Sequence, residues 1–331
     1  MTADYVDRLL AAADGGPQLA PITDTDPHFG VERAYETLAV LHARRMARGW
    51  RPVGRKIGFT NRTIWPRYGV YRPMWSHVWD RTVADAPDGA ASVDVTGLHE
   101  PRIEPEVVFG LDARLPAEGG SRDVLNAVAW VAAGFEIVHS VFHGSKFRAP
   151  DCTAAFGLHA RLVVGPRWPI GEDERDALAA LLPAFSLTLR RDGSVVETGV
   201  GANVLDSPAN ALVHLREVLA SQPLFPPLAA GEIVTTGTVT DAWPVATGET
   251  WTSDYGALPV QLEELTVQNV SPTLGNDQLR AGIIAGIIGL VLVSIYMLLY
   301  YRILGLVVVS GIMITAALLL AFAGTFDGAR Q

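Results

Sequence analysis

Two glutamates, two residues apart in an otherwise apolar stretch, are the first sign of chemistry in this sequence. The segment Pro-Arg-Ile-Glu-Pro-Glu-Val-Val-Phe, residues 101–109, carries Glu104 and Glu106. Side chains alternate along a β-strand, so these two carboxylates would share one face. They would repel each other unless a cation lay between them, and a buried carboxylate needs such a partner. A solvated edge strand marked by Pro105 is the alternative that this segment alone leaves open.

A third glutamate, Glu136, lies in the apolar run Gly-Phe-Glu-Ile-Val, residues 134–138. It follows a segment, Asp123–Gly134, that we predict to be helical. A lone carboxylate flanked by Phe, Ile and Val is costly to bury unless it binds a cation. Three oxygen ligands that leave positions open for water and substrate suit Mg²⁺ or Mn²⁺. Zinc is disfavoured, because no cysteine or histidine pair accompanies these acids.

A lysine in the run Gly-Arg-Lys-Ile-Gly, residues 54–58, is the candidate acid/base group. Lys56 alternates with apolar positions on an expected strand, and the flanking glycines allow close approach of a ligand. A partly buried lysine near a dication has a lowered pKa and can transfer protons. Taken by itself, the segment also fits a surface lysine at the end of a strand.

Seven segments in order resemble the 2-keto-4-pentenoate hydratase branch of the fumarylacetoacetate hydrolase superfamily, across about residues 30 to 256. They are Gly54-Arg-Lys-Ile-Gly-Phe-Thr60, Pro101-Arg-Ile-Glu-Pro-Glu106, Gly134-Phe-Glu-Ile-Val138, Asp151 followed by Leu158-His159, Asn203-Val-Leu-Asp-Ser-Pro208, Thr235-Thr-Gly-Thr-Val-Thr-Asp-Ala242 and Gly248-Glu-Thr-Trp251.

The resemblance implies a role for each candidate. Glu104, Glu106 and Glu136 would be the metal ligands. Lys56 and Asp151 would be catalytic groups in the active site, and Thr238 would lie in a turn that closes over the substrate. The chain departs from the family pattern at His143, Ser145, Ala160 and residues 154–156, and these changes near the expected pocket leave the exact substrate open.

The elements that must position these residues indicate an α+β fold, which the resemblance specifies as a mixed β-roll or sandwich with flanking helices. Apolar residues at helical spacing predict helices at Tyr5–Ala13, Val31–Ala47 and Ala209–Ala220. Short apolar runs between Gly, Pro and Asp predict strands at Val53–Phe59, Glu106–Leu111, Ala160–Val164, Phe185–Arg190 and Ile233–Thr236, with a hairpin turn at Asp192-Gly193. We divide the chain into a helical segment (1–50), a catalytic domain (51–258), a linker (259–280) and a hairpin (281–324).

The last of these parts has the composition of a membrane hairpin. Residues 281–301 and 303–324 carry no charge, and each run could cross a hydrocarbon layer of ~30 Å as a helix. Residues 257–313 resemble the membrane helices of SecD, a subunit of bacterial protein export. Most of that family is missing, so a membrane-tethered enzyme and a composite reading frame both stay open.

Composition limits the function further. The net charge is −9, which argues against a nucleic-acid partner, and the single cysteine, Cys152, excludes an intrachain disulfide. We expect a cytoplasmic catalytic domain, homo-oligomeric by resemblance, that hydrates a 2-hydroxy-2,4-dienoic acid to a 4-hydroxy-2-oxo acid. One alternative is a 4-oxalocrotonate decarboxylase, in which the metal-bound 2-oxo group would likewise accept electrons. The other is a membrane-assembly subunit whose soluble part is inert.

Overall fold

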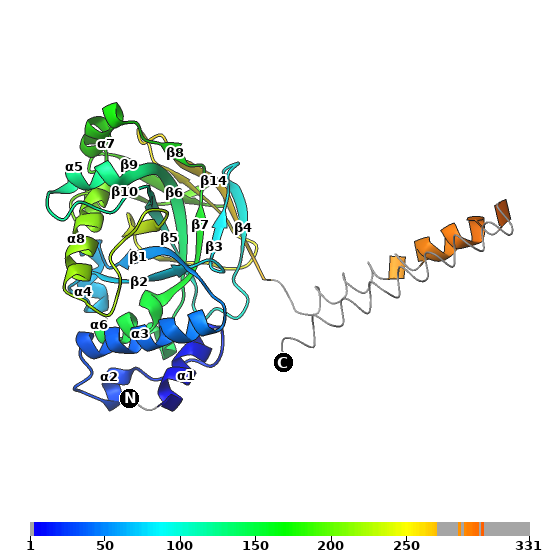
Figure 1. Cartoon of the computed structure of the whole chain (residues 1–331), viewed down its shortest axis with the longest axis horizontal. Coiled ribbons are helices and arrows are strands. Elements are labelled where there is room, and N and C mark those ends of the chain that lie inside the picture. Colours follow the sequence, from blue (N-terminus) through cyan, green and yellow to red (C-terminus); the bar gives the residue numbers. More distant parts are fainter. Residues whose placement is uncertain (1–2, 270–283, 286–287, 298, 301–331) are drawn as a thin grey trace. The chain divides into compact units, whose positions relative to one another are not determined.

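The computed structural model describes residues 3–269, 284–285, 288–297 and 299–300. The chain divides into two units, Met1–Asn269 and Val270–Gln331. Every candidate site residue falls in the first unit, which contains two β-sheets and the helices that pack against them (Figure 1).

The larger sheet holds the predicted site. Its strands run in the order β2-β1-β11-β5-β6-β7-β3, with β12 paired to β5 and β8 paired to β6. The pairs β1–β11 and β3–β7 are parallel, and the other pairs are antiparallel. The strands are β1 (Pro52–Gly58), β2 (Met74–Trp79), β3 (Val83–Asp85), β5 (Arg102–Leu111), β6 (Val128–Val138), β7 (His159–Val164), β8 (Trp168–Pro169), β11 (Ile233–Thr238) and β12 (Trp243–Pro244).

A second sheet has the order β10-β9-β13-β14-β4. Its strands are β4 (Ala90–Asp94), β9 (Ser186–Arg191), β10 (Ser194–Val200), β13 (Thr250–Asp254) and β14 (Gln261–Gln268). The predicted hairpin turn is confirmed: Asp192 and Gly193, between β9 and β10, both have positive φ, at 50° and 78°. Tyr255, just after β13, ties the two sheets together, because its buried hydroxyl donates to the Glu106 carbonyl at 2.7 Å.

Helices pack against the outside of these sheets. Helix α3 contacts α1 and α6, and α8 contacts β11 and α5. Helix α8 begins where Ser207 caps it by accepting a hydrogen bond from the Ala209 amide, and it buries Leu212, Leu215 and Leu219 as predicted. The α-helices are α1 (Ala3–Ala13), α2 (Ile22–Thr25), α3 (Val31–Ala47), α4 (Trp65–Tyr68), α5 (Ser121–Val124), α6 (Ala149–Ala154), α7 (Arg175–Leu181) and α8 (Pro208–Ala220). Short 3-10 turns are η1 (Arg62–Ile64), η2 (Leu125–Ala127), η3 (His143–Ser145), η4 (Phe156–Leu158), η5 (Glu172–Glu174) and η6 (Gly201–Asn203).

Two sequence predictions about this unit were wrong. The helix predicted at Asp123–Gly134 is two short turns followed by strand β6. Strand β6 lies inside the sheet, and most of its residues are buried on both faces. Apolar residues therefore follow one another along it, without the alternation of polar and apolar residues that marks a half-exposed strand. The linker predicted from residue 259 contains β14, and the compact unit ends at Asn269.

The predicted membrane hairpin lies largely outside the described residues. Within 281–324, the structure describes 284–285, 288–297 and 299–300, which are helical and carry exposed apolar side chains such as Leu292 and Leu299. Among the described residues of the chain, no helix is both long enough and apolar enough to cross a membrane.

Candidate active site

Three glutamates from two neighbouring strands form the centre of the candidate site. Glu104 and Glu106 lie on β5, and Glu136 lies on β6, directly opposite Glu104 in the antiparallel register. Each offers a ligand atom, and these atoms lie within 4.8 Å of one another. The predicted set is therefore brought together, with Glu106 and Glu136 fully buried and Glu104 half-buried.

The hydrogen bonds at this cluster leave two buried carboxylate oxygens without a hydrogen-bond donor in the described part of the chain. Glu106 Oε2 accepts from the Thr235 hydroxyl and from the Gly237 amide (2.8 Å), whereas its Oε1 accepts none. Glu136 Oε1 faces His159 Nδ1 at 2.7 Å, whereas its Oε2 accepts none. Buried carboxylate oxygens need a partner, and a cation among them would supply it. The donor set, oxygen atoms only, fits Mg²⁺ or Mn²⁺.

The Lys56 ammonium is the positive charge at this cluster. It is buried, donates to the Gly157 carbonyl at 3.0 Å, and lies 3.2 Å from Glu136 Oε2. Burial alone would lower its pKa, but the carboxylates of Glu136, Glu104 and Glu106 raise it above the ordinary lysine value. The sequence-based expectation of a lowered pKa concerned a lysine beside a dication, whereas this direction is set by the three carboxylates.

The three glutamates differ in the direction in which their pKa values are shifted. Burial, with Glu136 as a neighbouring charge, raises the pKa of Glu104 to about 7 against the attraction of Lys56. Burial and the charges of Glu136 and Glu104 raise the pKa of Glu106 well above its ordinary range. For Glu136, burial is outweighed by Lys56 and by the hydrogen bond with His159, so its pKa is lowered. The cluster is therefore built to hold both protons and negative charge.

A left-handed turn places the carbonyl that Lys56 contacts. Phe156, Gly157 and Leu158 have φ values of 56°, 59° and 64°, and a left-handed residue other than glycine costs about 1–2 kcal/mol. A Cβ on Gly157 would lie 3.1 Å from the Lys56 Cδ atom, so a side chain there would press on the lysine stem. Strain of this kind collects at functional sites.

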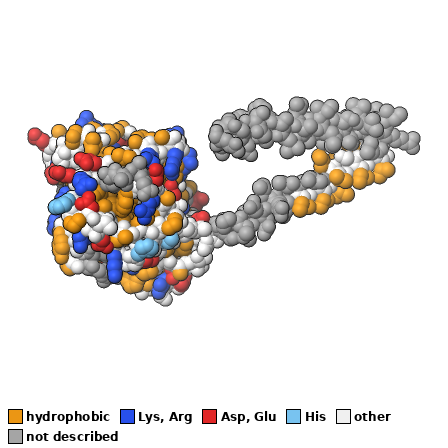
Figure 2. Space-filling view, turned by 90° about the horizontal axis from the view of Figure 1, so that it is seen from below, with side chains coloured by type: hydrophobic (Ala, Val, Ile, Leu, Met, Phe, Trp, Pro, Cys, Tyr) orange, Lys and Arg blue, Asp and Glu red, His pale blue; other side chains and the backbone are white. Residues whose placement is uncertain are grey.

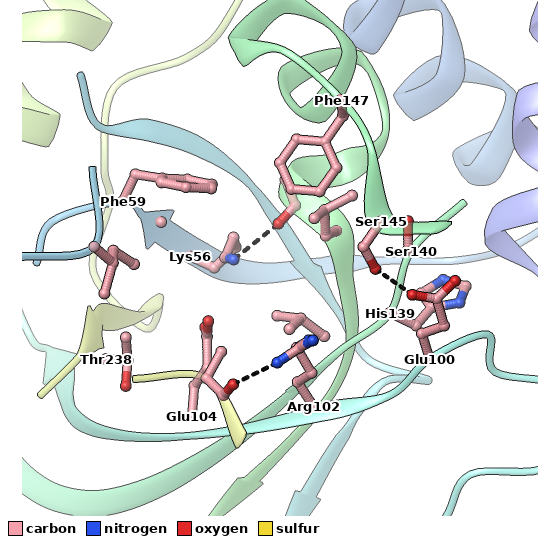
Figure 3. Close-up of a pocket in the computed structure, with 16 residues that line it drawn as sticks. Lys56, Phe59, Glu100, Arg102, Glu104, His139, Ser140, Ser145, Phe147 and Thr238 are labelled. Atoms are coloured by element: carbon pink, nitrogen blue, oxygen red, sulfur yellow. Dashed lines mark hydrogen bonds between the residues drawn. The ribbon is translucent and has the colours of Figure 1, made fainter. Parts of the chain in front are cut away.

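A pocket opens onto Lys56 and Glu104. Figure 3 shows Lys56 pointing to the Gly157 carbonyl, with Thr238 and Glu104 on one side and Phe59 and Phe147 on the other. The predicted substrate-binding residue Thr238 thus lies in the pocket wall. The pocket is lined by Lys56, Gly58, Phe59, Ile64, Glu100, Arg102, Glu104, Val138, His139, Ser140, Ser145, Phe147, Gly157, Leu158, Thr238 and Ala242.

The structure does not bring Asp151 to the cluster. Its buried carboxylate accepts hydrogen bonds from the Thr23 amide (3.0 Å) and hydroxyl (2.7 Å), and from the Arg148 amide (2.8 Å) at the start of α6. Asp151 is also absent from the pocket lining. The carboxylate joins α6 to α2.

Sequence reasoning missed several residues of the site. The Ser145 hydroxyl donates to Glu100 at 2.6 Å in the pocket wall, and Phe59 and Phe147 stack edge to face with ring centroids 6.4 Å apart. His159 lies in one of the segments of the family resemblance but had no predicted role, and it contacts Glu136. Arg102 shares a segment with Glu104, and Ser145 is a departure from the family pattern near the expected pocket, but neither had a predicted role.

Comparison with known proteins agrees with this geometry. Residues 55–265 match the family model described as fumarylacetoacetate (FAA) hydrolase, C-terminal. A 2-hydroxyhexa-2,4-dienoate hydratase from Comamonas testosteroni is 33% identical over 244 residues, covering 73% of this chain and 89% of the relative. A 2-keto-4-pentenoate hydratase from Paraburkholderia xenovorans is 33% identical over 233 residues, covering 69% of this chain and 81% of the relative.

A solved structure is similar over the same region. It is the 4-oxalocrotonate decarboxylase from Pseudomonas putida G7 in complex with magnesium and adipate, with a TM-score of 0.70 and 26% identity, covering 82% of this chain and 99% of that one. The family match stops at residue 265, so it gives no support to the SecD resemblance of the tail. The match to the family model and the similarity to these two hydratases show that the chain belongs to the fumarylacetoacetate hydrolase family.

Proposed function

We propose that this chain hydrates a 2-hydroxy-2,4-dienoic acid, of the 2-hydroxypenta-2,4-dienoate type, to a 4-hydroxy-2-oxo acid. Glu104, Glu106 and Glu136 would hold Mg²⁺ or Mn²⁺. The observation that carries the proposal is the pair of buried oxygens that accept no hydrogen bond, Glu106 Oε1 and Glu136 Oε2, the second beside the Lys56 ammonium, behind a pocket that contains Lys56. The names of the two hydratase relatives support the same reaction class.

A divalent cation in this position supplies an electrophile that draws electron density from the carboxylate and 2-oxygen of a 2-oxo acid. The chain's own residues do the rest. Lys56, held by Gly157 and charged beside the glutamates, is placed to hold the anionic end of the substrate and to carry a proton. In the overall reaction the enol proton leaves, C5 gains a proton, and water adds its hydroxyl to C4 and its hydrogen to C3.

The pocket wall fits the hydrocarbon end of such a substrate. Phe59, Ile64 and Phe147 give it an apolar side, and exclusion of bulk water by these side chains strengthens the interactions of Lys56 and Glu104. The pocket's polar side includes Thr238, whose side chain is buried in the wall.

Decarboxylation of 4-oxalocrotonate is the second candidate, and Arg102 favours it. Arg102 lines the pocket and donates to the Ala242 carbonyl at 2.9 Å. A guanidinium has five N–H donors, so Arg102 could also bind the second carboxylate of an enedioate. The similarity to a decarboxylase complexed with adipate points the same way.

Loss of dienoate absorbance, measured together with product mass, tests the two candidates. Gain of one water from 2-hydroxypenta-2,4-dienoate supports the hydratase, and loss of CO₂ from 4-oxalocrotonate supports the decarboxylase. Glu106→Gln should abolish Mn²⁺ binding or activity, whereas Glu263→Gln, a change at an exposed glutamate of β14, should leave both intact. Full activity of the Glu106→Gln variant would refute the metal site.

Several expectations rest on the sequence alone. We infer a membrane hairpin from the uncharged runs of residues 281–324, so the full chain should partition with detergent and the fragment 1–269 should not. Full-length protein that stays in the aqueous phase would refute it. The family resemblance implies a homo-oligomer, which sedimentation of the fragment would test. On the face that Figure 2 shows, basic and acidic side chains are interspersed.

A further inference from the structure

His159 connects the glutamate cluster to Thr82, which lies between β2 and β3. Its side chain is buried at the first position of β7, immediately after the left-handed turn at Gly157. Nδ1 lies 2.7 Å from Glu136 Oε1, and Nε2 lies 2.8 Å from the Thr82 hydroxyl. Both ring nitrogens are therefore engaged, one by a proposed metal ligand and one by a residue outside the pocket lining.

The direction of these hydrogen bonds follows from the donors available. The Trp79 amide donates to Thr82 Oγ1 at 3.2 Å, and the Thr82 hydroxyl lies within donating distance of both the Trp79 carbonyl (3.0 Å) and His159 Nε2 (2.8 Å). An ionised Glu136 can only accept a hydrogen bond, so Nδ1 of His159 must carry a proton and donate it to Glu136. In a neutral imidazole Nε2 is then an acceptor, and the Thr82 hydroxyl donates to it instead of to the Trp79 carbonyl. This assignment satisfies each of these atoms at once.

The position of the hydrogen bond matters for Glu136. It occupies Oε1 and leaves Oε2 as the oxygen without a hydrogen-bond donor, on the side of Lys56. A carboxylate fixed through one oxygen has less rotational freedom to lose when the other oxygen takes a ligand. Outer hydrogen-bond partners of metal ligands characteristically contribute about 10–100-fold to metal affinity.

We propose that His159, oriented by Thr82, is a positioning residue that holds Glu136 with Oε2 directed to the cation. The proposal rests on the metal site of the proposed function, and it adds residues that touch neither substrate nor metal. His159 and Thr82 would set the affinity of the site through Glu136.

Another pair of buried histidines shows that burial alone does not create this arrangement. His42 and His77 are also buried, and their Nδ1 atoms lie 2.6 Å apart, so they satisfy each other. Aromatic rings surround them, and the charges that shift their pKa values are arginines and a histidine, not carboxylates. His42→Leu is therefore a matched control, because it removes a buried imidazole without touching the cluster.

The test is a titration of the metal-free full chain with Mn²⁺, followed by the electron paramagnetic resonance signal of the free ion, without substrate. His159→Leu should weaken Mn²⁺ binding by about 10–100-fold. His159→Asn should recover most of that loss, because the Asn amide nitrogen can replace Nδ1 as the donor. His42→Leu should lower the melting temperature but bind Mn²⁺ as the wild type does.

Each outcome decides one question. Wild-type affinity in His159→Leu, or an equal loss in His42→Leu, would overturn the positioning role while leaving the metal site in place. Absence of Mn²⁺ binding in the wild type would instead overturn the proposed function. If His159→Leu does not fold, Thr82→Val and Thr82→Ser decide: weaker binding in the valine variant supports the proposal, and equal binding refutes it.

Discussion

Metal binding to this chain should release protons, because the metal-free cluster holds protons that a cation must displace. Burial and neighbouring carboxylates raise the pKa of Glu104 to about 7 and that of Glu106 well above its ordinary range. The pKa of Glu136 is lowered, chiefly because Lys56 outweighs the effect of burial. Ligands to a divalent cation must be ionised, so every proton on the glutamates has to leave.

The expected number follows from these values. At pH 7, Glu104 carries a proton about half of the time. Binding should thus release about half a proton from Glu104 at pH 7, more at pH 6 and less at pH 8, and a proton held by Glu106 adds to this number. The apparent Mn²⁺ affinity should rise with pH, by roughly tenfold per pH unit for each proton released.

Calorimetric titration of Mn²⁺ in two buffers with different ionisation enthalpies gives the proton number directly. Glu106→Gln removes a ligand whose pKa is raised, so any residual binding should release fewer protons than in the wild type. An observed heat that is independent of the buffer at pH 6–8, or an affinity that does not change with pH, would refute the protonated cluster.

Three further predictions concern neighbouring residues. Lys56→Met should lower the rate by about 10² or more, since it removes the only ammonium in the pocket lining; a steady-state assay that finds an unchanged rate would return Lys56 to a structural role. Asp151→Asn should cost about 1–3 kcal/mol of unfolding free energy by weakening the hydrogen bonds to Thr23, with Mn²⁺ affinity unchanged; lost activity at full stability would restore its catalytic assignment. The metal-free chain should lose stability as the pH rises from about 4.5 through 7, because Glu104 and Glu106 bind more protons folded than unfolded; thermal melts that rise over this window would contradict the raised pKa values.

The clustering of the three glutamates proposed as metal ligands could be predicted from the sequence because their signal is local. Alternation along a strand puts Glu104 and Glu106 on one face, and an isolated acid in the run around Glu136 is costly without a partner. The register that places Glu104 opposite Glu136 could not be predicted, because it depends on strand pairing across a long connection. The mistaken helix at Asp123–Gly134 did not affect the choice of Glu136, since the cost of burial is the same in either element.

Where a residue's role depends on the direction of its side chain, that role could not be predicted from the sequence. Asp151 has the residue type of an acid/base group, but its place near the start of α6 turns the carboxylate to backbone amides and to Thr23. His159 has the residue type of a satisfied core residue, and only the fold shows that its Nδ1 lies against a metal-ligand candidate. Neither outcome follows from composition or periodicity.

The glutamates of the site and the residues of its pocket wall come from different parts of the fold. The glutamates lie on β5 and β6, at the middle of the larger sheet, and the groups that hold them come from β11 and β7. Much of the pocket wall comes instead from connecting segments, such as Phe59 after β1 and Phe147 before α6. Connecting segments can change without disturbing the packing of the sheet. Discrimination between a dienoate and an enedioate should therefore depend on these connecting segments and on Arg102 at the start of β5, whereas metal affinity and proton release should depend on the glutamates and the strands that hold them.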